Sequence, residues 1–261
     1  IYSMPPPSSG GVCIAQILKL IEPWSLRRLS TSSPQYLHLF AEASRLAFAD
    51  RSKHLGDPDF AVLPTDALYS DVYLDTRRKL IDPDHATPSE HLLPGEPLAV
   101  ESEQTTHFCV ADGEGNLVSL TYTLNTAYGS NLVVEGAGFL LNNEMDDFSI
   151  KPGHPNVYGL VGGEANKIEP GKRMLSSMSP TIVFEIRQGR EFPYLVLGSP
   201  GGSKIITTVA QAILDVTRFG MAPEKVVAEP RFHHQWLPDL LYLEQGGYDS
   251  NVKQELIRLG H

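Results

Sequence analysis

Thr105 stands where a threonine could act as a nucleophile. The sequence QTTHFCV follows a loop rich in Pro, Gly and Glu and begins a strand-like run. A threonine hydroxyl reacts only after a base takes its proton, and one solution uses the residue's own α-amine, freed when the chain is cut just before it. A loop that enters a strand would hold such a new terminus rigidly. An ordinary threonine at the start of a strand gives the same local pattern.

The segment PGGS at 200–203 follows an apolar strand-like run and opens a helix. Glycines let a ligand approach the backbone, and N–H groups at the start of a helix can hold an anion or a developing oxyanion. Gly201 and Gly202 are therefore candidates for an oxyanion hole, and an ordinary strand-to-helix turn is the alternative. The GxxxxGK[ST] pattern of a phosphate-binding loop is absent.

Acidic and amide side chains follow two further strand-like runs. Asn125 ends LTYTLN, and Glu144, Asp146 and Asp147 lie in LLNNEMDDFS. Carboxylates and an amide together could bind an ammonium group, although Asn and Asp also favour turns. The spacing of these acids is not that of an EF-hand, and we predict no metal here.

Two serines and two histidines complete the candidates. Ser176 and Ser177, in RMLSSMSP, could donate hydrogen bonds to a carboxylate. His233 and His234 are adjacent in a strand-like run, so their side chains should face opposite ways and not bind one ion. The motifs HExxH, CxxC and GxSxG are absent, which leaves zinc-protease and α/β-hydrolase chemistry unsupported.

Apolar spacing predicts helices in the first part of the chain. One helix has a stripe at positions i, i+3, i+4 and i+7, formed by Ile14, Ile17, Leu18 and Ile21. A second helix begins at Ser33-Pro34, where a capping residue precedes a proline, and runs through YLHLFAEASRLAFADR. A short helix is expected near 66–80.

Strand pairs and a helix are predicted after Thr105. The hairpins are THFCVAD–GEGN–LVSLTYTLN and SPTIVFEI–RQGR–EFPYLVLGS, and GAGFLLNN is expected to add a strand. Residues 151–173 should form a long loop. KIITTVAQAILDVTRFG should be a helix with Ser203 as its cap and Gly220 as its stop. Because helices and strand pairs segregate, we expect an α+β fold with antiparallel sheet and helices packed outside.

The overall composition narrows the function classes. A length of 261 residues suits one large domain or two small ones, and 41% hydrophobic residues allow a sizeable core. The net charge of -10 argues against nucleic acid as the main partner, because phosphates attract basic surfaces. No run approaches the roughly 20 apolar residues of a membrane-spanning helix.

Cys13 and Cys109 are too few for a disulfide framework. We expect two buried thiols, with one disulfide as the alternative. The chain starts at Ile1 without a signal peptide or an initiator Met, which we interpret as an internal point of a longer protein.

Together, these stretches resemble the γ-glutamyltransferase (γ-glutamyltranspeptidase) family. The matching segments follow the family's order over almost the whole chain: MPPPSSGG, AEASRLAFADRSKHLGDPDF, QTTHFCVADGEGN, LTYTLNTAYGS, LLNNEMDDFS, PNVYGLVGGEAN, RMLSSMSPTIV, LGSPGGSKIITT and APEKVVAEPRFHHQWLPD. The resemblance implies the αββα sandwich of N-terminal nucleophile (Ntn) hydrolases, incomplete at its N-terminal side. It also implies a precursor that cuts itself between Gln104 and Thr105. Residues 1–104 would be the C-terminal part of the large-subunit region and residues 105–261 the small-subunit region, together one αββα domain.

The resemblance also implies a role for each candidate residue. Thr105 would attack the γ-glutamyl carbonyl with its own α-amine as base, and Thr123 would orient it and assist self-cleavage. Gly201 and Gly202 would form the oxyanion hole. The donor's α-amino group would be bound by Asn125, Glu144 and Asp147, its α-carboxylate by Ser176 and Ser177, and the pocket would be covered by the lid residue Tyr158.

The implied reaction takes a γ-glutamyl group from glutathione or a similar donor and passes it to water, an amino acid or a peptide, without a cofactor. A periplasmic or secreted location follows from the resemblance alone. The family's N-terminal large-subunit region carries an arginine that pairs with the donor's α-carboxylate, and no residue of this chain can be assigned that role. We therefore do not expect the isolated chain to be active. The alternatives are a sister amidohydrolase of the cephalosporin or glutaryl acylase type and an inactive, unprocessed fragment.

Overall fold

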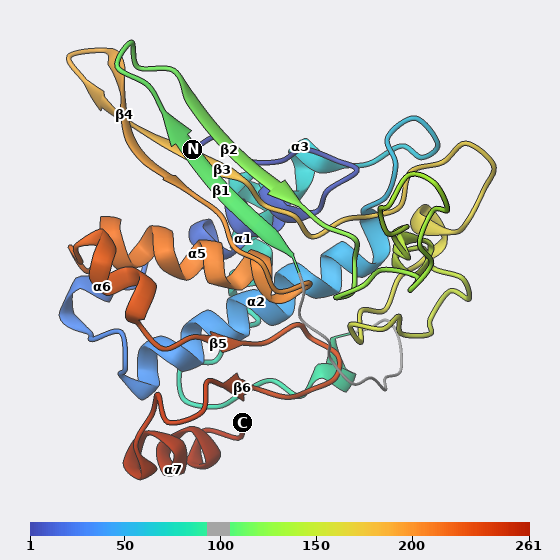
Figure 1. Ribbon diagram of the computed structural model, residues 1–261. Coiled ribbons are helices and arrows are strands. Elements are labelled where there is room, and N and C mark those ends of the chain that lie inside the picture. The colour runs from blue at the N-terminus through green and yellow to red at the C-terminus, as the bar shows by residue number, and fades with distance from the viewer. Residues whose placement is uncertain (93–104) are drawn as a thin grey trace.

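The computed structural model describes residues 1–92 and 105–261, and its two long hairpins lie together on one side of the main helices (Figure 1). The described helices are α1 (Gly10–Ile21), α2 (Pro34–His54), α3 (Thr65–Leu68), α4 (Asp71–Arg78), α5 (Lys204–Thr217), α6 (Pro223–Ala228) and α7 (Ser250–Arg258). The described strands are β1 (Thr106–Ala111), β2 (Leu117–Tyr122), β3 (Thr181–Arg187), β4 (Arg190–Leu197), β5 (Phe232–His233) and β6 (Tyr242–Leu243). They pair as three antiparallel two-stranded sheets, β1–β2, β3–β4 and β5–β6.

The core lies between α1, α2 and α5, beneath the β1–β2 and β3–β4 hairpins (Figure 1). Helix α1 is amphipathic, and Ile14, Ile17 and Ile21 of its predicted stripe are buried, whereas the fourth member, Leu18, is partly buried. Helix α2 is buried on every side, because each residue from Tyr36 to Ser52 is buried. A helix that is enclosed in this way organises the elements around it.

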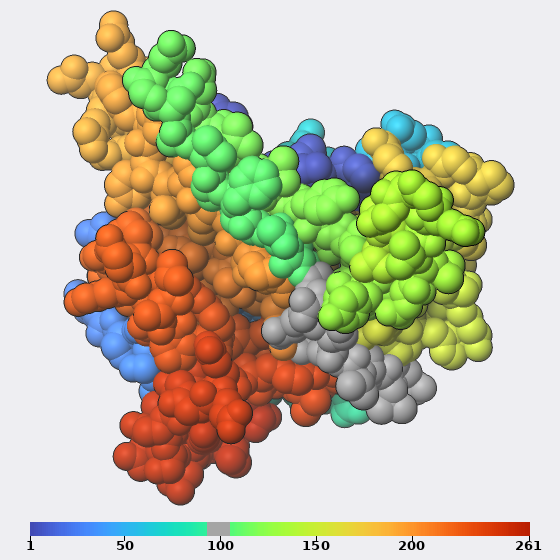
Figure 2. Space-filling view, in the orientation of Figure 1, coloured from blue at the N-terminus to red at the C-terminus, as the bar shows by residue number. Residues whose placement is uncertain are grey.

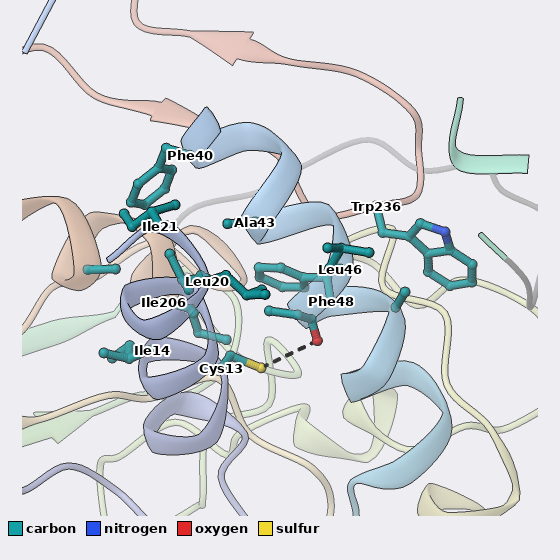
Figure 3. Close-up of a cluster of buried hydrophobic side chains, with 14 of the residues drawn as sticks. Cys13, Ile14, Leu20, Ile21, Phe40, Ala43, Leu46, Phe48, Ile206 and Trp236 are labelled. Atoms are coloured by element: carbon teal, nitrogen blue, oxygen red, sulfur yellow. Dashed lines mark hydrogen bonds between the residues drawn. The ribbon is translucent and has the colours of Figure 1, made fainter. Parts of the chain in front are cut away.

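The core contains residues that precede Thr105 in the sequence and residues that follow it. Figure 3 shows Ile14 and Leu20 of α1 and Phe48 of α2 in one cluster with Ile206 of α5 and Trp236. Full burial of one such aliphatic or aromatic side chain contributes about 1.5–3 kcal/mol. Side-chain packing alone therefore couples the first 92 residues strongly to the rest of the chain.

The buried charges of α2 are paired with residues from other elements. Arg45 Nη1 lies 2.6 Å from Asp239 Oδ1, and Asp50 Oδ1 lies 2.8 Å from Arg77 Nη2. An unpaired charge in this environment would be strongly unfavourable. These ion pairs therefore fix α4 and the segment after β5 to the central helix.

Ser119 joins the two large hairpins. Its hydroxyl accepts a hydrogen bond from Thr181 N at 3.1 Å and donates one to Leu197 O at 3.0 Å, and Thr181 and Leu197 are themselves partners in the β3–β4 register. The tips of both hairpins project beyond the helices (Figure 2, green and orange). One face of β1–β2 is apolar and 38–66% exposed, and consists of Phe108, Val110, Val118, Leu120 and Tyr122.

Most of the predicted elements are confirmed. The region near 66–80 forms two helices, α3 and α4, instead of one. The strand predicted in GAGFLLNN is wrong: Gly136 and Gly138 have φ angles of 78° and 74°, and only an isolated bridge joins Val133 to Leu140. Glycines in this left-handed region interrupt an extended strand.

The helix predicted after PGGS is confirmed as α5, and its predicted cap is confirmed in position but not in hydrogen bonding. Ser203 lies at the N-cap position and makes no capping hydrogen bond to the helix backbone. Gly220 has a φ angle of 68°, three residues after α5 ends at Thr217. Within the described residues, no helix has both the length and the apolar character that membrane crossing requires.

The cysteines differ from the expectation. Both are free, so the disulfide alternative is wrong, and Cys13 is buried whereas Cys109 is exposed on β1. Burial raises the pKa of the Cys13 thiol to about 12. Since the thiolate is the reactive form, Cys13 should be inert in the folded protein.

We predict that a maleimide labels Cys109 in the native protein and labels Cys13 only after unfolding. Peptide mass mapping after a short reaction at neutral pH, with and without denaturant, measures this directly. Labelling of both cysteines at equal rates without denaturant would contradict the packing of α1 against α2.

Candidate active site

Thr105 and Thr123 meet at the open end of the β1–β2 hairpin. Thr106 is opposite Tyr122 in the antiparallel register, so the residues just outside the two strands are neighbours. The Thr105 hydroxyl donates to Thr123 Oγ1 at 3.2 Å, and Thr123 Oγ1 also accepts a hydrogen bond from Asn125 N at 2.9 Å. Gln104, on the other side of the predicted cleavage point, lies outside the described residues.

A small cavity brings together eight of the ten predicted site residues. Its volume is about 20 Å³, and its lining is Thr105, Thr123, Asn125, Asp147, Tyr158, Ser176, Ser177, Met178, Gly202 and Ile205. Gly201 and Glu144 do not line it. A volume of this size holds about one water molecule, so a larger ligand would have to displace part of the lining.

Asp147 is the half-buried acid of the cavity. It ends the short 3-10 turn Glu144–Asp147, and burial raises the pKa of its carboxyl to about 7. The positive charge of Arg51 opposes this rise, whereas the neighbouring Glu144 and Asp146 add to it. A partly desolvated acid that gains from a nearby cation is suited to bind an ammonium group.

Ser176 and Ser177 are held by the N-terminal loop and by α2. Ser9 donates a hydrogen bond to the carbonyl of Ser176 at 2.8 Å, and Arg51 Nε donates to the Ser9 hydroxyl at 2.9 Å. Arg51 Nη2 also donates to Ser177 Oγ at 3.3 Å. A buried cation therefore supports the serine pair.

Arg51 is the residue of this cluster that sequence reasoning missed. The available signal was an arginine in the last turns of a helix whose apolar residues occupy every face, since such an arginine needs a buried partner. Its partners are Ser9 and Ser177. The separation of 126 residues between Arg51 and Ser177 hides that contact in the sequence.

Tyr158 and Gly202 both line the cavity and lie against each other. A Cβ added to Gly202 would lie 2.5 Å from Tyr158 Cε1, and Gly202 has a φ angle of 54°. Tyr158 donates a hydrogen bond from its hydroxyl to Asn125 O at 2.5 Å. Glycine at 202 is therefore required both for the backbone conformation and for the close approach of the ring.

The two adjacent histidines contact different partners. His233 lies against Thr207 and Gln235, whereas His234 Nδ1 accepts a hydrogen bond from Trp236 N and Nε2 lies 3.3 Å from Asp239 Oδ1. Each ring is engaged by protein groups on both nitrogens, in agreement with the expectation that the pair does not share an ion.

Within the described part of the chain, three side chains of the kinds that bind metal ions lie close together, away from this cavity. His38, Glu42 and His261 have ligand atoms within 4.8 Å of one another. His38 Nδ1 is 2.8 Å from His261 Nε2, and Glu42 Oε1 is 3.2 Å from Arg45 Nε. Because the two rings bond to each other and Arg45 balances the charge of Glu42, we assign no metal to the cluster.

Comparisons with known proteins agree with the geometry. The family model of gamma-glutamyltranspeptidase matches residues 1–261. The glutathione hydrolase proenzyme of Escherichia coli is 51% identical over 253 residues, which are 97% of this chain and 43% of that protein. The chain thus spans less than half the length of this relative.

Solved structures give the fold. A gamma-glutamyltranspeptidase mutant from Helicobacter pylori is 59% identical, with a TM-score of 0.56, over 60% of this chain and 82% of that chain. A cephalosporin acylase from Bacillus halodurans, at 24% identity, superposes on 99% of this chain and 43% of that chain with a TM-score of 0.78. The fold is thus the predicted α+β fold of Ntn hydrolases, and the chain belongs to the gamma-glutamyltranspeptidase family.

Proposed function

We propose that this chain carries the catalytic part of a γ-glutamyltransferase or glutathione hydrolase, with Thr105 as its nucleophile. The observation that carries the proposal is the contact between the Thr105 and Thr123 hydroxyls inside a cavity that also presents Asp147, Ser177 and Gly202. A nucleophile, an acid, a hydroxyl pair and a glycine turn are the groups that acyl transfer from an amino-acid donor requires.

Self-cleavage comes first in the proposed sequence. While Thr105 is joined to Gln104, its nitrogen is an amide and cannot act as a base. The Thr105 hydroxyl attacks the Gln104 carbonyl, the peptide C–N bond breaks as the departing nitrogen takes the hydroxyl proton, and water hydrolyses the resulting ester. The product has a free Thr105 α-amine next to its own hydroxyl.

Turnover then proceeds in two steps. The α-amine accepts the hydroxyl proton as Thr105 Oγ1 attacks the γ-carbonyl of the donor, and the N–H groups of the turn at Gly201 and Gly202 stabilise the oxyanion. The C–N bond breaks, the leaving amine takes the proton, and a γ-glutamyl ester remains. Water or the amine of an amino acid or peptide attacks this ester and restores the hydroxyl.

Donor recognition is assigned to the walls of the cavity. Asp147, with Asn125 and Glu144, binds the α-ammonium group, while Ser176 and Ser177 bind the α-carboxylate, and the buried Arg51 supports Ser177. The cavity of about 20 Å³ has to widen for this, and Tyr158 is the side chain that we assign as its lid. Glutathione and related γ-glutamyl compounds are the proposed donors.

Replacing Thr105 by Ala should abolish both self-cleavage and turnover, because the attacking oxygen is lost. Intact mass under denaturing conditions, before and after long incubation, measures the cut, and release of amine from a γ-glutamyl substrate measures turnover. Thr106→Ala removes a neighbouring hydroxyl and is the matched control, which should still split. A Thr105→Ala protein that splits at the same bond would instead reveal a contaminating protease.

A glutaryl substrate tests whether the site recognises the α-amino group of the donor. It has the same acyl chain without the α-amine, so it cannot pair with Asp147. We expect kcat/KM at least about tenfold lower for the glutaryl compound than for its γ-glutamyl analogue, since a hydrogen bond to a charged group contributes about 1.5–3 kcal/mol. Equal rates for both compounds would favour an acylase of the cephalosporin or glutaryl type.

Asp147→Asn should stabilise the folded protein and weaken donor binding. Desolvation in the cavity raises the pKa of the half-buried Asp147 carboxyl from 3.8 to about 7, so the folded state favours the protonated form. The proton on Asp147 therefore adds to the free energy of unfolding below pH 4, and this contribution is lost as the pH rises through 7. The melting temperature of the variant should therefore exceed that of the unaltered protein by an amount that grows between pH 4 and pH 8.

The same variant should raise KM for the γ-glutamyl donor at pH 8 by about tenfold or more, because Asn cannot supply a negative charge. Glu164→Gln removes an equal charge from an exposed side chain and is the control for both measurements. A melting-temperature difference that is constant over this pH range would contradict the assigned burial of Asp147.

A further inference from the structure

Gln235 is buried behind the candidate active site and connects two of its walls. It follows β5, is 2% exposed and does not line the cavity. Its side-chain oxygen Oε1 lies 2.6 Å from Ser203 Oγ and 2.8 Å from His233 Nε2. Its nitrogen Nε2 donates to Tyr158 O at 2.8 Å and to Leu237 O at 3.1 Å.

The partners determine the orientation of this amide. Backbone carbonyl oxygens only accept hydrogen bonds, so the NH₂ group has to face Tyr158 O and Leu237 O. The oxygen then faces Ser203 and His233, and both must donate to it. All four hydrogen-bonding positions of the amide are occupied, and no rotated arrangement satisfies the same partners.

The histidine behind the amide is fixed by the same logic. With its proton on Nε2, His233 presents the lone pair of Nδ1 to the Thr207 hydroxyl, 2.7 Å away on α5, whose one proton is shared between Nδ1 and Lys204 O. Burial lowers the pKa of His233 to about 3, so the ring stays neutral over the working pH range. Gln235 is thus anchored to α5 through His233 as well as through Ser203.

Both walls that Gln235 contacts are next to assigned catalytic groups. Ser203 directly follows Gly202 in the turn assigned to the oxyanion hole, and Tyr158 packs its ring against Gly202 from the other side. One amide therefore ties the turn to the backbone of the loop that carries Tyr158. Ser203 makes this contact from a residue with helical angles, φ -61° and ψ -28°, in place of the extended angles typical of a capping residue.

We propose that Gln235 is a positioning residue, which sets the spacing between the Gly201–Gly202 turn and the Tyr158 loop. This inference rests on the proposed function, because it assumes that the turn stabilises an oxyanion. A turn that is held rigidly stabilises charge in the transition state more than it binds the ground-state donor. Loss of the tie should thus lower kcat more than it raises the donor KM.

Two variants at this position separate positioning from simple packing. Gln235→Met keeps the length of the side chain and removes all four hydrogen bonds. Gln235→Glu keeps an acceptor for Ser203 and His233, but places a carboxylate against Tyr158 O and Leu237 O. Protonation of that carboxyl restores one donor, so the Glu variant should recover activity as the pH falls.

Gln16→Met is the matched control. Gln16 is equally buried, at 1%, and donates to Asp50 and to Leu68 O, neither of which lines the cavity. The three variants and the unaltered protein are compared at full natural length after self-cleavage. The measurements are kcat and donor KM between pH 5 and pH 9 and the melting temperature.

We expect kcat to fall about tenfold to a hundredfold in Gln235→Met with a smaller change in KM, as for a misplaced catalytic group. The ratio of Glu-variant to wild-type kcat should rise toward low pH, and Gln16→Met should lose stability without losing kcat. A kcat in Gln235→Met equal to that of the control would overturn the inference.

Failure of the proposed function is a different result. In that case the unaltered protein shows no γ-glutamyl turnover, whatever stands at position 235. A crystal structure of Gln235→Met then decides the positioning role alone. The distance from Gly202 N to Tyr158 O should change relative to the unaltered protein, and an unchanged distance would overturn the inference.

Discussion

The enclosure of α2 is the constraint on which the rest of this structure depends. A buried helix with only apolar side chains would need nothing more than close packing. Helix α2 also has four buried charged residues, Glu42, Arg45, Asp50 and Arg51. Each of these charges needs a partner from elsewhere in the chain. The helix consequently fixes the C-terminal segment through Asp239, α4 through Arg77 and the serine pair through Ser177. Hydrophobic burial gives the fold its free energy, and the buried charges of α2 decide which segments come together.

The candidate active site follows the same rule on a smaller scale. The polar groups around Thr105 are supported by a second layer of buried polar contacts: Ser9 and Arg51 behind the serines, and Gln235 and His233 behind the glycine turn. Buried polar networks are stable only when every member is satisfied, so they specify geometry strongly. Asp147 is less well satisfied, since desolvation raises its pKa and its Oδ1 accepts a long hydrogen bond of 3.4 Å from Asn156 Nδ2. Such stored unfavourable energy is typical of a group that binds a charged ligand.

Sequence reasoning predicted the parts of the molecule that local patterns encode. Thr105 and Thr123 flank one predicted hairpin, so antiparallel pairing alone places them together. The roles of the site residues stay predictions, as does the division at Gln104. Arg51 and Gln235 were not predicted, because their roles depend on contacts between distant parts of the sequence. Arg51 contacts Ser177, 126 residues away, and Gln235 contacts Tyr158, 77 residues away. The strand expected in GAGFLLNN is wrong because its glycines adopt left-handed angles. Ser203 does lie at the predicted N-cap position, but its backbone is helical and its hydroxyl donates to Gln235.

The core that Figure 3 shows has a thermodynamic consequence for a chain that is cut before Thr105. Helices α1 and α2 would then belong to one polypeptide, and Ile206 and Trp236 to another, with no loss of packing between them. The interior of the domain would become an interface between two molecules. Folding and association would be one event, and the melting temperature would depend on protein concentration by mass action. Dilution, which has no effect on the stability of the uncut chain, would become a denaturing condition for the cut one.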